Sequence, residues 1–486
     1  MNWKVIIRNI GFALLVNALF MLFAVIVSMA NGNDSALAAL MISFTITFIV
    51  GIFPFFFVRK TTSISLREGY VIITLSWLLS FVFGLLPYVL WGGPFTLSNA
   101  IFESVSGYTT CGATILNDVE ALPRSLLFWR SSTHFIGGLG VVVFLLLLIP
   151  ESSQMRMRLT NMELSSLSRS GYSSRTTNVV YIFAYVYLAL VILAVLAYVL
   201  AGMSPFDALC HAMAVVATGG FSTRTMSIAA FDSYWIEGIT MLFMYLSSIH
   251  FGLLYLAVIT RSLKPLGSPV IKFYTAFVAV VAVFLGIGLK VGGMCDSWAE
   301  SIWDGLFNTL TISSTTGFAN LDNSHWPFWM VALTLFPAII CGTTGSTCGG
   351  IKSDRALILL KAVGRYVNSI LHPSSINEIR LGRKILRDSD VSPHLLYISI
   401  YMFFIFISML LCLISGLDFE SSLVSSVMSI GNVGPGCGEL MGSLGSYDSA
   451  PTFAKLVFSL DMFLGRVEIF PVLAVLGMIF DKRDRQ

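Results

Sequence analysis

The amino-acid sequence predicts an all-α polytopic membrane protein with an internal fourfold repeat and an extra helix pair at its N-terminus. Three observations lead to this fold class. Of the 486 residues, 56% are hydrophobic and 11% are charged, whereas about a quarter of the residues in soluble domains are charged. Ten apolar windows are long enough to cross a bilayer, and four shorter stretches between them match one another. Composition therefore excludes a soluble fold before any motif is considered.

The ten windows follow one another along the chain. They lie at 10–30, 36–58, 70–91, 125–150, 179–202, 235–260, 270–292, 327–360, 393–416 and 452–480. The first is too long for a cleaved signal peptide, so we expect a retained helix. If the N-terminus is cytoplasmic, all but six of the 29 lysines and arginines lie on the cytoplasmic side, which is the positive-inside distribution. Both termini are then cytoplasmic.

Four stretches, at 98–116, 205–223, 300–320 and 418–438, are too short to cross a bilayer. Aligned on one glycine, they read YTTCGAT, VATGGFST, SSTTGFAN and IGNVGPGC, and about a dozen helix-compatible residues precede each. One such loop is an ordinary turn. Four copies, each between two spans, predict re-entrant loops around one pore.

This repeat divides the chain into five units. The predicted units are an N-terminal two-helix hairpin at 1–67 and pore repeats at 68–155, 156–265, 266–390 and 391–486.

The chemistry of such loops favours a cation filter. Non-helical backbone at membrane depth is tolerated where it lines a wet cavity, and a ring of carbonyl oxygens replaces the hydration shell of a cation. Glycine lets successive carbonyls point the same way. The predicted filter residues are Thr110, Cys111, Gly112, Thr218, Gly219, Gly220, Thr315, Thr316, Gly317, Asn432, Val433 and Gly434.

The window at 327–360 is interrupted by CGTTGSTCGG at 341–350. This segment is too flexible and polar to remain a continuous helix in lipid, so it predicts a movable constriction; the alternative is a helix kink or a packing face of small residues. The predicted gate-loop residues are Gly342, Thr343, Thr344, Gly345, Ser346, Gly349 and Gly350.

Other polar residues are explained by helix capping or by packing in the core. Asp207, Asp304 and Glu420 are interpreted as residues that cap the half-helices, which is compatible with a negative vestibule. His134 and His211 are expected to be core residues rather than proton carriers. Seven scattered cysteines indicate neither a disulfide framework nor a metal site.

No nucleotide motif and no nucleophile with a base can be assembled, so we expect no cofactor and no enzyme. A membrane-embedded enzyme is the least favoured class. The net charge of +3 is too small to suggest nucleic-acid binding.

These motifs together carry a family resemblance. The plan of span, half-helix, loop and span, with TTCGAT, ATGGFSTR, STTGFANLD and GNVGPG, resembles the Trk/Ktr/HKT superfamily of potassium transporters over essentially the whole chain. The N-terminal helix pair and FLGRVEIFPVL at 463–473 resemble its TrkH/TrkG branch. Cys111 stands where a threonine is usual in that branch, but the backbone carbonyl is the coordinating group.

The resemblance implies K⁺ uptake across the bacterial inner membrane, with K⁺, and Rb⁺ as a further candidate ion, bound only at the filter, and a homodimer. It also implies a TrkA-like cytosolic nucleotide-binding subunit, for which the basic segments 151–178 and 361–392 could provide docking sites. A H⁺- or Na⁺-coupled K⁺ symporter of the same fold is the alternative.

The resemblance further implies an arginine that projects into the pore below the filter. Arg466 lies within the last apolar window, where a charge is costly and usually functional. It is therefore expected to form an electrostatic barrier. The alternative is a structural ion pair with Asp461 or Glu468.

Overall fold

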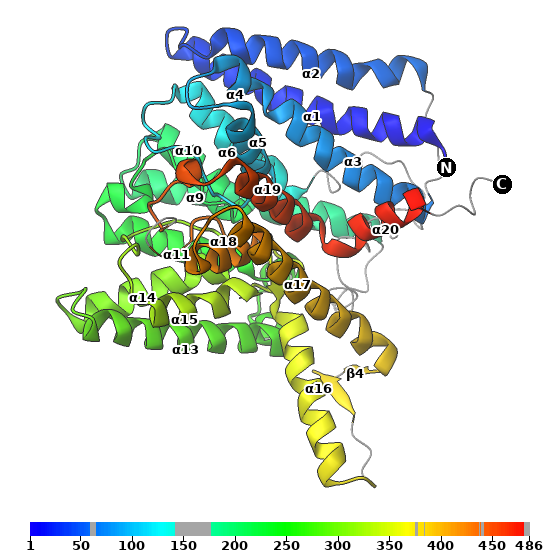
Figure 1. Cartoon of the computed structure of the whole chain (residues 1–486), viewed down its shortest axis with the longest axis vertical. Helices are drawn as coiled ribbons and strands as arrows, with labels where there is room; N and C mark the ends of the chain where they lie inside the picture. Colours follow the sequence, from blue (N-terminus) through cyan, green and yellow to red (C-terminus); the bar gives the residue numbers. More distant parts are fainter. Residues whose placement is uncertain are drawn as a thin grey trace.

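The computed structural model describes residues 1–58, 65–140, 176–374, 378–382, 384–436, 438 and 442–480. Helices dominate this part of the chain, and most of the long ones run across the view in Figure 1 in roughly one direction. Within the described residues, six helices are long and apolar enough to cross a membrane, or seven if one bent pair forms a single crossing. The predicted all-α membrane fold is therefore confirmed, and the ten-span threading remains a prediction.

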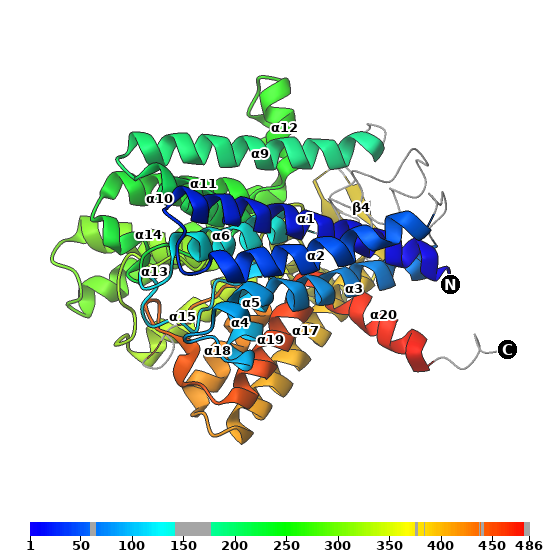
Figure 2. The same cartoon turned by 90° about the horizontal axis from the view of Figure 1, so that it is seen from above.

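The N-terminal helix pair precedes the four repeats and packs against the first of them. Helices α1 (Trp3–Ala30) and α2 (Leu37–Phe57) lie side by side in both Figure 1 and Figure 2. Glycines permit this close packing, because a methyl group added to Gly11 would lie 2.7 Å from the backbone oxygen of Gly51. The helix pair expected from the sequence is present.

Four repeats follow. The first contains α3 (Leu66–Gly84), α4 (Leu86–Trp91), α5 (Leu97–Tyr108) and α6 (Arg124–Leu139). The second contains α9 (Thr176–Leu200), α10 (Pro205–Ala217), η2 (Ser227–Phe231), α11 (Tyr234–Ser248), α12 (Phe251–Ile259) and η3 (Lys264–Gly267). The third contains α13 (Pro269–Val291), α14 (Trp298–Ser313), α15 (Phe328–Ile339), β1 (Ile340–Cys341), β2 (Ile351–Lys352), α16 (Ser353–Leu371), β3 (Ile379–Leu381) and β4 (Lys384–Leu386). The fourth contains α17 (Asp388–Ile414), α18 (Phe419–Gly431), η4 (Tyr447–Ser449), α19 (Thr452–Val467) and α20 (Ile469–Phe480).

Helices α5, α10, α14 and α18 occupy the four predicted half-helix positions, and we call them the pore helices. The irregular segments that follow them, loops 1 to 4, begin at Thr109, Thr218, Ser314 and Asn432. A side-chain oxygen caps the first turn of each pore helix, which satisfies a backbone N–H that has no partner within the helix. The capping residues are Thr96, Ser204, Ser297 and Asp418.

This capping pattern shows that the expected capping role of Asp304 is wrong. Asp304 does not open its half-helix, because α14 already begins at Trp298 and Ser297 accepts the capping hydrogen bond from the Glu300 N–H at 3.1 Å. Asp304 lies in the second turn, where it accepts a 2.7 Å hydrogen bond from the Asn320 side chain in loop 3. Asp207 and Glu420 do lie in the first turns of α10 and α18.

Three apolar windows are interrupted rather than continuous. Helices α11 and α12 are bent by 101° at their break, and Figure 2 shows α12 projecting past α9. The window at 452–480 is broken at Glu468, because Pro471 in the first turn of α20 has no N–H for the carbonyl of Val467. Between α15 and α16 the chain leaves the helix from 340 to 352 and is closed by the parallel pair β1–β2.

Helix α16 extends away from the membrane-spanning body together with the antiparallel hairpin β3–β4 (Figure 1). A small separate core of Ile358, Ile379, Leu386 and Val391 joins the helix to the hairpin. Residues 141–150 of the window at 125–150 and residues 151–175 of the segment at 151–178 lie outside the described residues.

Candidate functional site

The four loops share one unusual backbone conformation. The residue two positions before each aligned glycine has a positive φ, and so does the glycine itself, while the residue between them does not. The φ values are 53°, 57°, 55° and 53° at Thr110, Thr218, Thr315 and Asn432, and 84°, 78°, 77° and 100° at Gly112, Gly220, Gly317 and Gly434. Positive φ is uncommon outside glycine. Four repetitions of this alternation therefore indicate one common architecture, in which successive carbonyls can turn to the same side.

The loops close into a ring in chain order. A methyl group added to the aligned glycine of any loop would collide with a backbone oxygen of the next loop, and loop 4 meets loop 1. The glycine and oxygen pairs are Gly112 with Gly219, Gly220 with Thr316, Gly317 with Val433, and Gly434 with Cys111. The structure thus brings all twelve predicted filter residues together.

Each of the first three loops is hydrogen-bonded to its own pore helix. The pore-helix residue that makes the contact lies nine positions before the aligned glycine. Glu103 accepts from the Ile115 N–H at 3.1 Å, His211 contacts the Ser222 hydroxyl at 2.9 Å, and Asn308 donates to the Asn320 side chain at 3.1 Å. These bonds use the segment after the glycine. They do not involve the carbonyls of Cys111, Gly219, Thr316 or Val433.

The two histidines are core residues, as expected. His134 contacts the Gly107 oxygen at 2.7 Å and accepts from the Phe221 N–H at 3.1 Å. His211 contacts the Asp207 oxygen at 2.8 Å through its other ring nitrogen. Both side chains are fully buried, with hydrogen bonds at both nitrogens.

Cavities lie on both sides of the ring. The first, the mouth cavity, measures about 50 Å³ and is lined by Gly112, Gly220, Gly317 and Pro435 among others. The second, the gate cavity, measures about 130 Å³ and is lined by Gly137, residues of the gate loop, Lys352 and Arg466 among others. The ring of loops therefore separates two hollow spaces.

The irregular segment at 341–350, which we call the gate loop after its predicted role, lies against the C-terminal ends of pore helices. Its Thr347 hydroxyl donates to the Val216 oxygen of α10 at 3.0 Å, and the Gly349 N–H donates to the Thr315 hydroxyl of loop 3 at 2.9 Å. A methyl group on Gly349 would collide with the Gly431 oxygen of α18. All seven predicted gate-loop residues lie in this irregular segment. The segment is a loop that connects the paired strands β1 and β2, not a kink within a continuous helix.

Arg466 reaches the gate loop from the end of α19. Its guanidinium donates to the Thr347 oxygen at 2.7 Å and to the Gly137 oxygen at 2.6 Å. The two carboxylates considered as alternative partners engage other groups: Asp461 accepts a hydrogen bond from the Ser408 hydroxyl, and Glu468 forms an ion pair with Arg355. The geometry places the arginine between the gate loop and α6.

Among the described residues, acidic and cysteine side chains add no metal site to this arrangement. Asp207 accepts a 2.6 Å hydrogen bond from Thr223 and pairs with Arg224 at 2.9 Å, so it holds the far end of loop 2. Across the described residues, no group of three histidine, cysteine or acidic side chains could hold a metal ion. Cys341 and Cys348 are buried thiols at the base of the gate loop.

Sequence reasoning missed two residues at the ring. Glu103 of α5 and Arg130 of α6 form a buried ion pair behind loop 1 at 2.8 Å. The available signal was one acidic residue in IFESV and one basic residue in LLFWRSSTHF, both in apolar stretches where an isolated charge is costly.

Comparisons with known proteins agree with this architecture. The family model TrkH, described as a cation transport protein, matches residues 36–282 and 269–482. The Trk system potassium uptake protein TrkG of Escherichia coli (strain K12) is 31% identical, covering 98% of both chains. The Trk system potassium uptake protein TrkI of Halomonas elongata is 31% identical, covering 99% of this chain and 97% of that protein.

A solved structure is similar over nearly the whole chain. The crystal structure of the potassium transporter TrkH from Vibrio parahaemolyticus superposes with a TM-score of 0.88 at 29% identity, covering 98% of this chain and 99% of that one.

Proposed function

We propose, since the chain belongs to the TrkH family of cation transport proteins, that it mediates K⁺ uptake across the bacterial inner membrane. Membership of a transport family also agrees with the expectation of a transporter rather than an enzyme. The observation that carries the proposal is the closed ring of glycines and carbonyl oxygens formed by the four loops. Relatives of similar length that are named potassium uptake proteins support K⁺ as the ion.

In this proposal the ring is the selectivity filter. The carbonyls of Cys111, Gly219, Thr316 and Val433 would replace part of the hydration shell of K⁺. The pore helices end at the loops, so the negative ends of their dipoles point toward the ion. No other metal or cofactor is needed for this chemistry.

The gate cavity would be the cytoplasmic exit and the mouth cavity the outer entrance, with both termini cytoplasmic. Arg466 would oppose the cation as it leaves the filter, and the gate loop would have to move aside for conduction. The hydrogen bonds from Arg466 to the gate loop and to α6 support a joint role of Arg466 and the gate loop at this exit, because the arginine side chain connects the two elements.

Regulation would come from a TrkA-like cytosolic nucleotide-binding subunit. The segment at 361–392 contains six lysines and arginines against three acidic residues, and it includes the end of α16 and the hairpin that extend from the body (Figure 1). That arrangement suits docking of a cytosolic protein. A homodimer is proposed by resemblance alone, as is permeation of Rb⁺.

The proposal is tested by growth of a bacterium that lacks its own K⁺ uptake systems. Expression of this chain with its partner subunit should restore growth at low K⁺, and expression of the chain alone should restore it less. Absence of rescue by membrane-inserted protein would contradict the proposal.

Electrical recording separates a channel from the symporter alternative. For a channel, the K⁺ current should reverse at the K⁺ equilibrium potential at every pH and Na⁺ concentration. A reversal potential that follows the H⁺ or Na⁺ gradient would favour coupled transport.

A further inference from the structure

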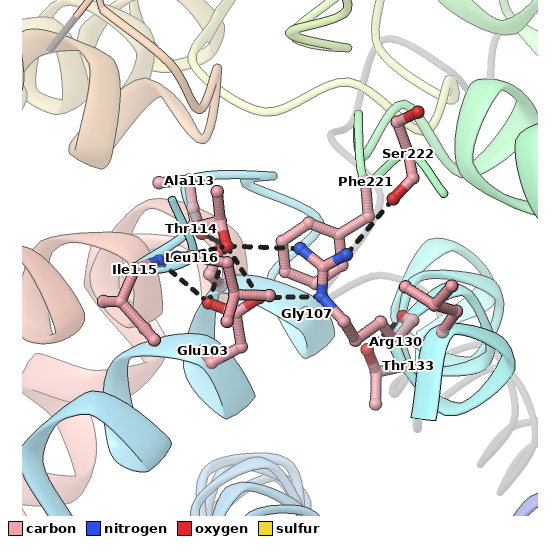
Figure 3. A network of polar contacts seen from close by, with 12 residues as sticks. Glu103, Gly107, Ala113, Thr114, Ile115, Leu116, Arg130, Thr133, Phe221 and Ser222 are labelled. Atoms are coloured by element: carbon pink, nitrogen blue, oxygen red, sulfur yellow. Dashed lines mark hydrogen bonds and ion pairs between the residues drawn. The ribbon is translucent and has the colours of Figure 1, made fainter. Parts of the chain in front are cut away.

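Helix α6 presents two buried side chains, one helical turn apart, to the junction between loops 1 and 2. Arg130 is 2% exposed and His134 is fully buried. Both contact loop 2 close to Gly220, although both belong to the first repeat. Figure 3 shows Arg130 between Glu103 on one side and Phe221 and Ser222 on the other.

The guanidinium of Arg130 contacts equivalent positions in two loops. It donates to the Thr114 hydroxyl at 3.2 Å and to the Ser222 oxygen at 3.2 Å. Thr114 and Ser222 each lie two residues after the aligned glycine of their loop. One planar group thus bridges loops 1 and 2 at equivalent positions.

Glu103 fixes the guanidinium in that position. Its carboxylate accepts from the Arg130 Nε at 2.8 Å and from the Thr114 hydroxyl at 3.0 Å. The carboxylate also accepts from the Ile115 N–H. Because a buried charge without its partner is strongly unfavourable, the pair cannot separate without a large cost. The ion pair therefore ties pore helix α5, loop 1 and α6 into one unit.

Phe221 completes the junction from the side of loop 2. Its ring lies 4.0 Å from the guanidinium carbon of Arg130 and stacks on His134 with centroids 4.2 Å apart. Its backbone N–H donates to His134. Phe221 directly follows Gly220, so its position determines where the carbonyls of Gly219 and Gly220 point.

Hydrogen bonds between neutral groups also cross the junction of loops 2 and 3 and the junction of loops 3 and 4. The Ala319 N–H in loop 3 donates to Ser227 after loop 2 at 3.2 Å, and Ser443 donates to the Leu321 oxygen at 2.7 Å. Neutral hydrogen bonds are weaker than those made by charged groups. Among the described residues of the four loops and their pore helices, the junction of loops 1 and 2 is distinguished by its buried ion pair.

We infer that Arg130 is a specificity-determining positioning residue, which sets the spacing between loops 1 and 2 and thereby the discrimination of K⁺ from Na⁺. This inference rests on the proposed function. A guanidinium is needed because its planar donors reach Glu103, Thr114 and Ser222 at once, whereas a lysine ammonium lacks this fork geometry.

The test uses the full-length protein in liposomes and compares K⁺ and Na⁺ flux. Arg130→Lys keeps the charge beside Glu103, so it should fold and conduct, but its K⁺ to Na⁺ flux ratio should fall by about tenfold, which corresponds to roughly 1.4 kcal/mol. Phe221→Leu should lower the ratio in the same direction. Asn17→Ala is the control, because it removes a buried 3.0 Å hydrogen bond to Ser80 between α1 and α3, away from the loops.

A second measurement does not depend on transport. A bound ion raises the unfolding temperature of the folded protein, so K⁺ should stabilise the wild-type protein more than Na⁺ does. That difference should shrink in Arg130→Lys and persist in Asn17→Ala.

The outcomes separate the two claims. Wild-type protein that neither transports nor is stabilised by K⁺ contradicts the proposed function. A wild-type protein that selects K⁺, together with Arg130→Lys and Phe221→Leu proteins that retain the wild-type ratio, overturns the role of Arg130 alone. If Arg130→Lys is not recovered as folded protein, Phe221→Leu with an unchanged ratio overturns the inference by itself.

Discussion

Arg355 forms an ion pair with Glu468 at 2.9 Å, which joins the first turn of α16 to the residue where the last apolar window breaks. Arg355 is almost fully buried, and its guanidinium carbon lies 3.7 Å from the ring centroid of Tyr397. Glu468 has a φ of 63°, which is unfavourable for a residue other than glycine. The pair therefore links the end of the gate loop to the backbone next to Arg466.

Breaking this ion pair should destabilise the protein. Glu468→Gln would leave the buried guanidinium of Arg355 without its counter-charge. The loss of one partner of a fully buried pair costs roughly 3 kcal/mol, and because the Glu468 side chain is 25% exposed, the expected loss is at most about this figure. The thermal unfolding midpoint of the purified protein would measure this loss. The double variant Arg355→Met with Glu468→Gln should recover much of it, whereas additive losses in the double variant would show that the two residues act independently.

The sequence predicted the elements of this site better than their connections. Apolar windows and the aligned glycines located the long apolar helices, the pore helices and the ring of loops, because hydrophobic length and backbone requirements are local properties. The pairing of Arg355 with Glu468 joins residues far apart in the chain, and hydropathy does not encode such a contact. The sequence suggested Glu468 as a partner for Arg466, and the structure shows its ion pair with Arg355.

The sequence does contain a local motif that marks the true start of α14, before Asp304. The sequence SWAE at 297–300 has the spacing of a capping box, with a serine followed three residues later by a glutamate. Ser297 is indeed the N-cap of α14. Reading this motif would have placed the start of the helix correctly and moved Asp304 into the second turn.

Replacement of a ring glycine should impair selectivity. In Gly220→Ser the new side chain would collide with the Thr316 oxygen and would occupy a backbone with a φ of 78°. Because the neighbouring carbonyl must move, the K⁺ to Na⁺ flux ratio in liposomes should fall while membrane insertion is retained; Gly317→Ser should do the same. Gly477→Ser is the matched control, since no atom lies within 4 Å of the position of its added Cβ. Unchanged selectivity in Gly220→Ser and Gly317→Ser would remove these glycines from the filter.

Shortening the gate loop should raise the basal flux. Deletion of 344–347 removes the Thr347 hydrogen bond to α10 and the carbonyl that accepts from Arg466. With the constriction reduced, K⁺ flux without the partner subunit should approach the flux with it. The measurement is uptake into liposomes with and without the partner. A folded deletion variant that conducts no K⁺ would instead indicate a structural role for the loop.

Removal of the positive charge at Arg466 should increase the flux. A unit charge a few ångströms from the cation path opposes K⁺ by about 1 to 4 kcal/mol at effective dielectrics between those of water and a protein surface. Such a barrier slows passage by roughly several-fold to several hundred-fold. Arg466→Ala also removes the hydrogen bonds to Thr347 and Gly137, so both the barrier and one restraint on the gate loop disappear.

The expected result for Arg466→Ala is a higher K⁺ flux at saturating K⁺, from protein whose unfolding temperature is close to that of the wild type. Asp461→Asn is the comparison variant, because the Asp461 carboxylate accepts a hydrogen bond from Ser408 and an asparagine oxygen can accept the same bond. It should leave the flux unchanged. If Arg466→Ala destabilises the protein and does not raise the flux, then Arg466 serves to hold the gate loop against α6 through its hydrogen bonds to Thr347 and Gly137, and its assignment as the pore barrier is withdrawn.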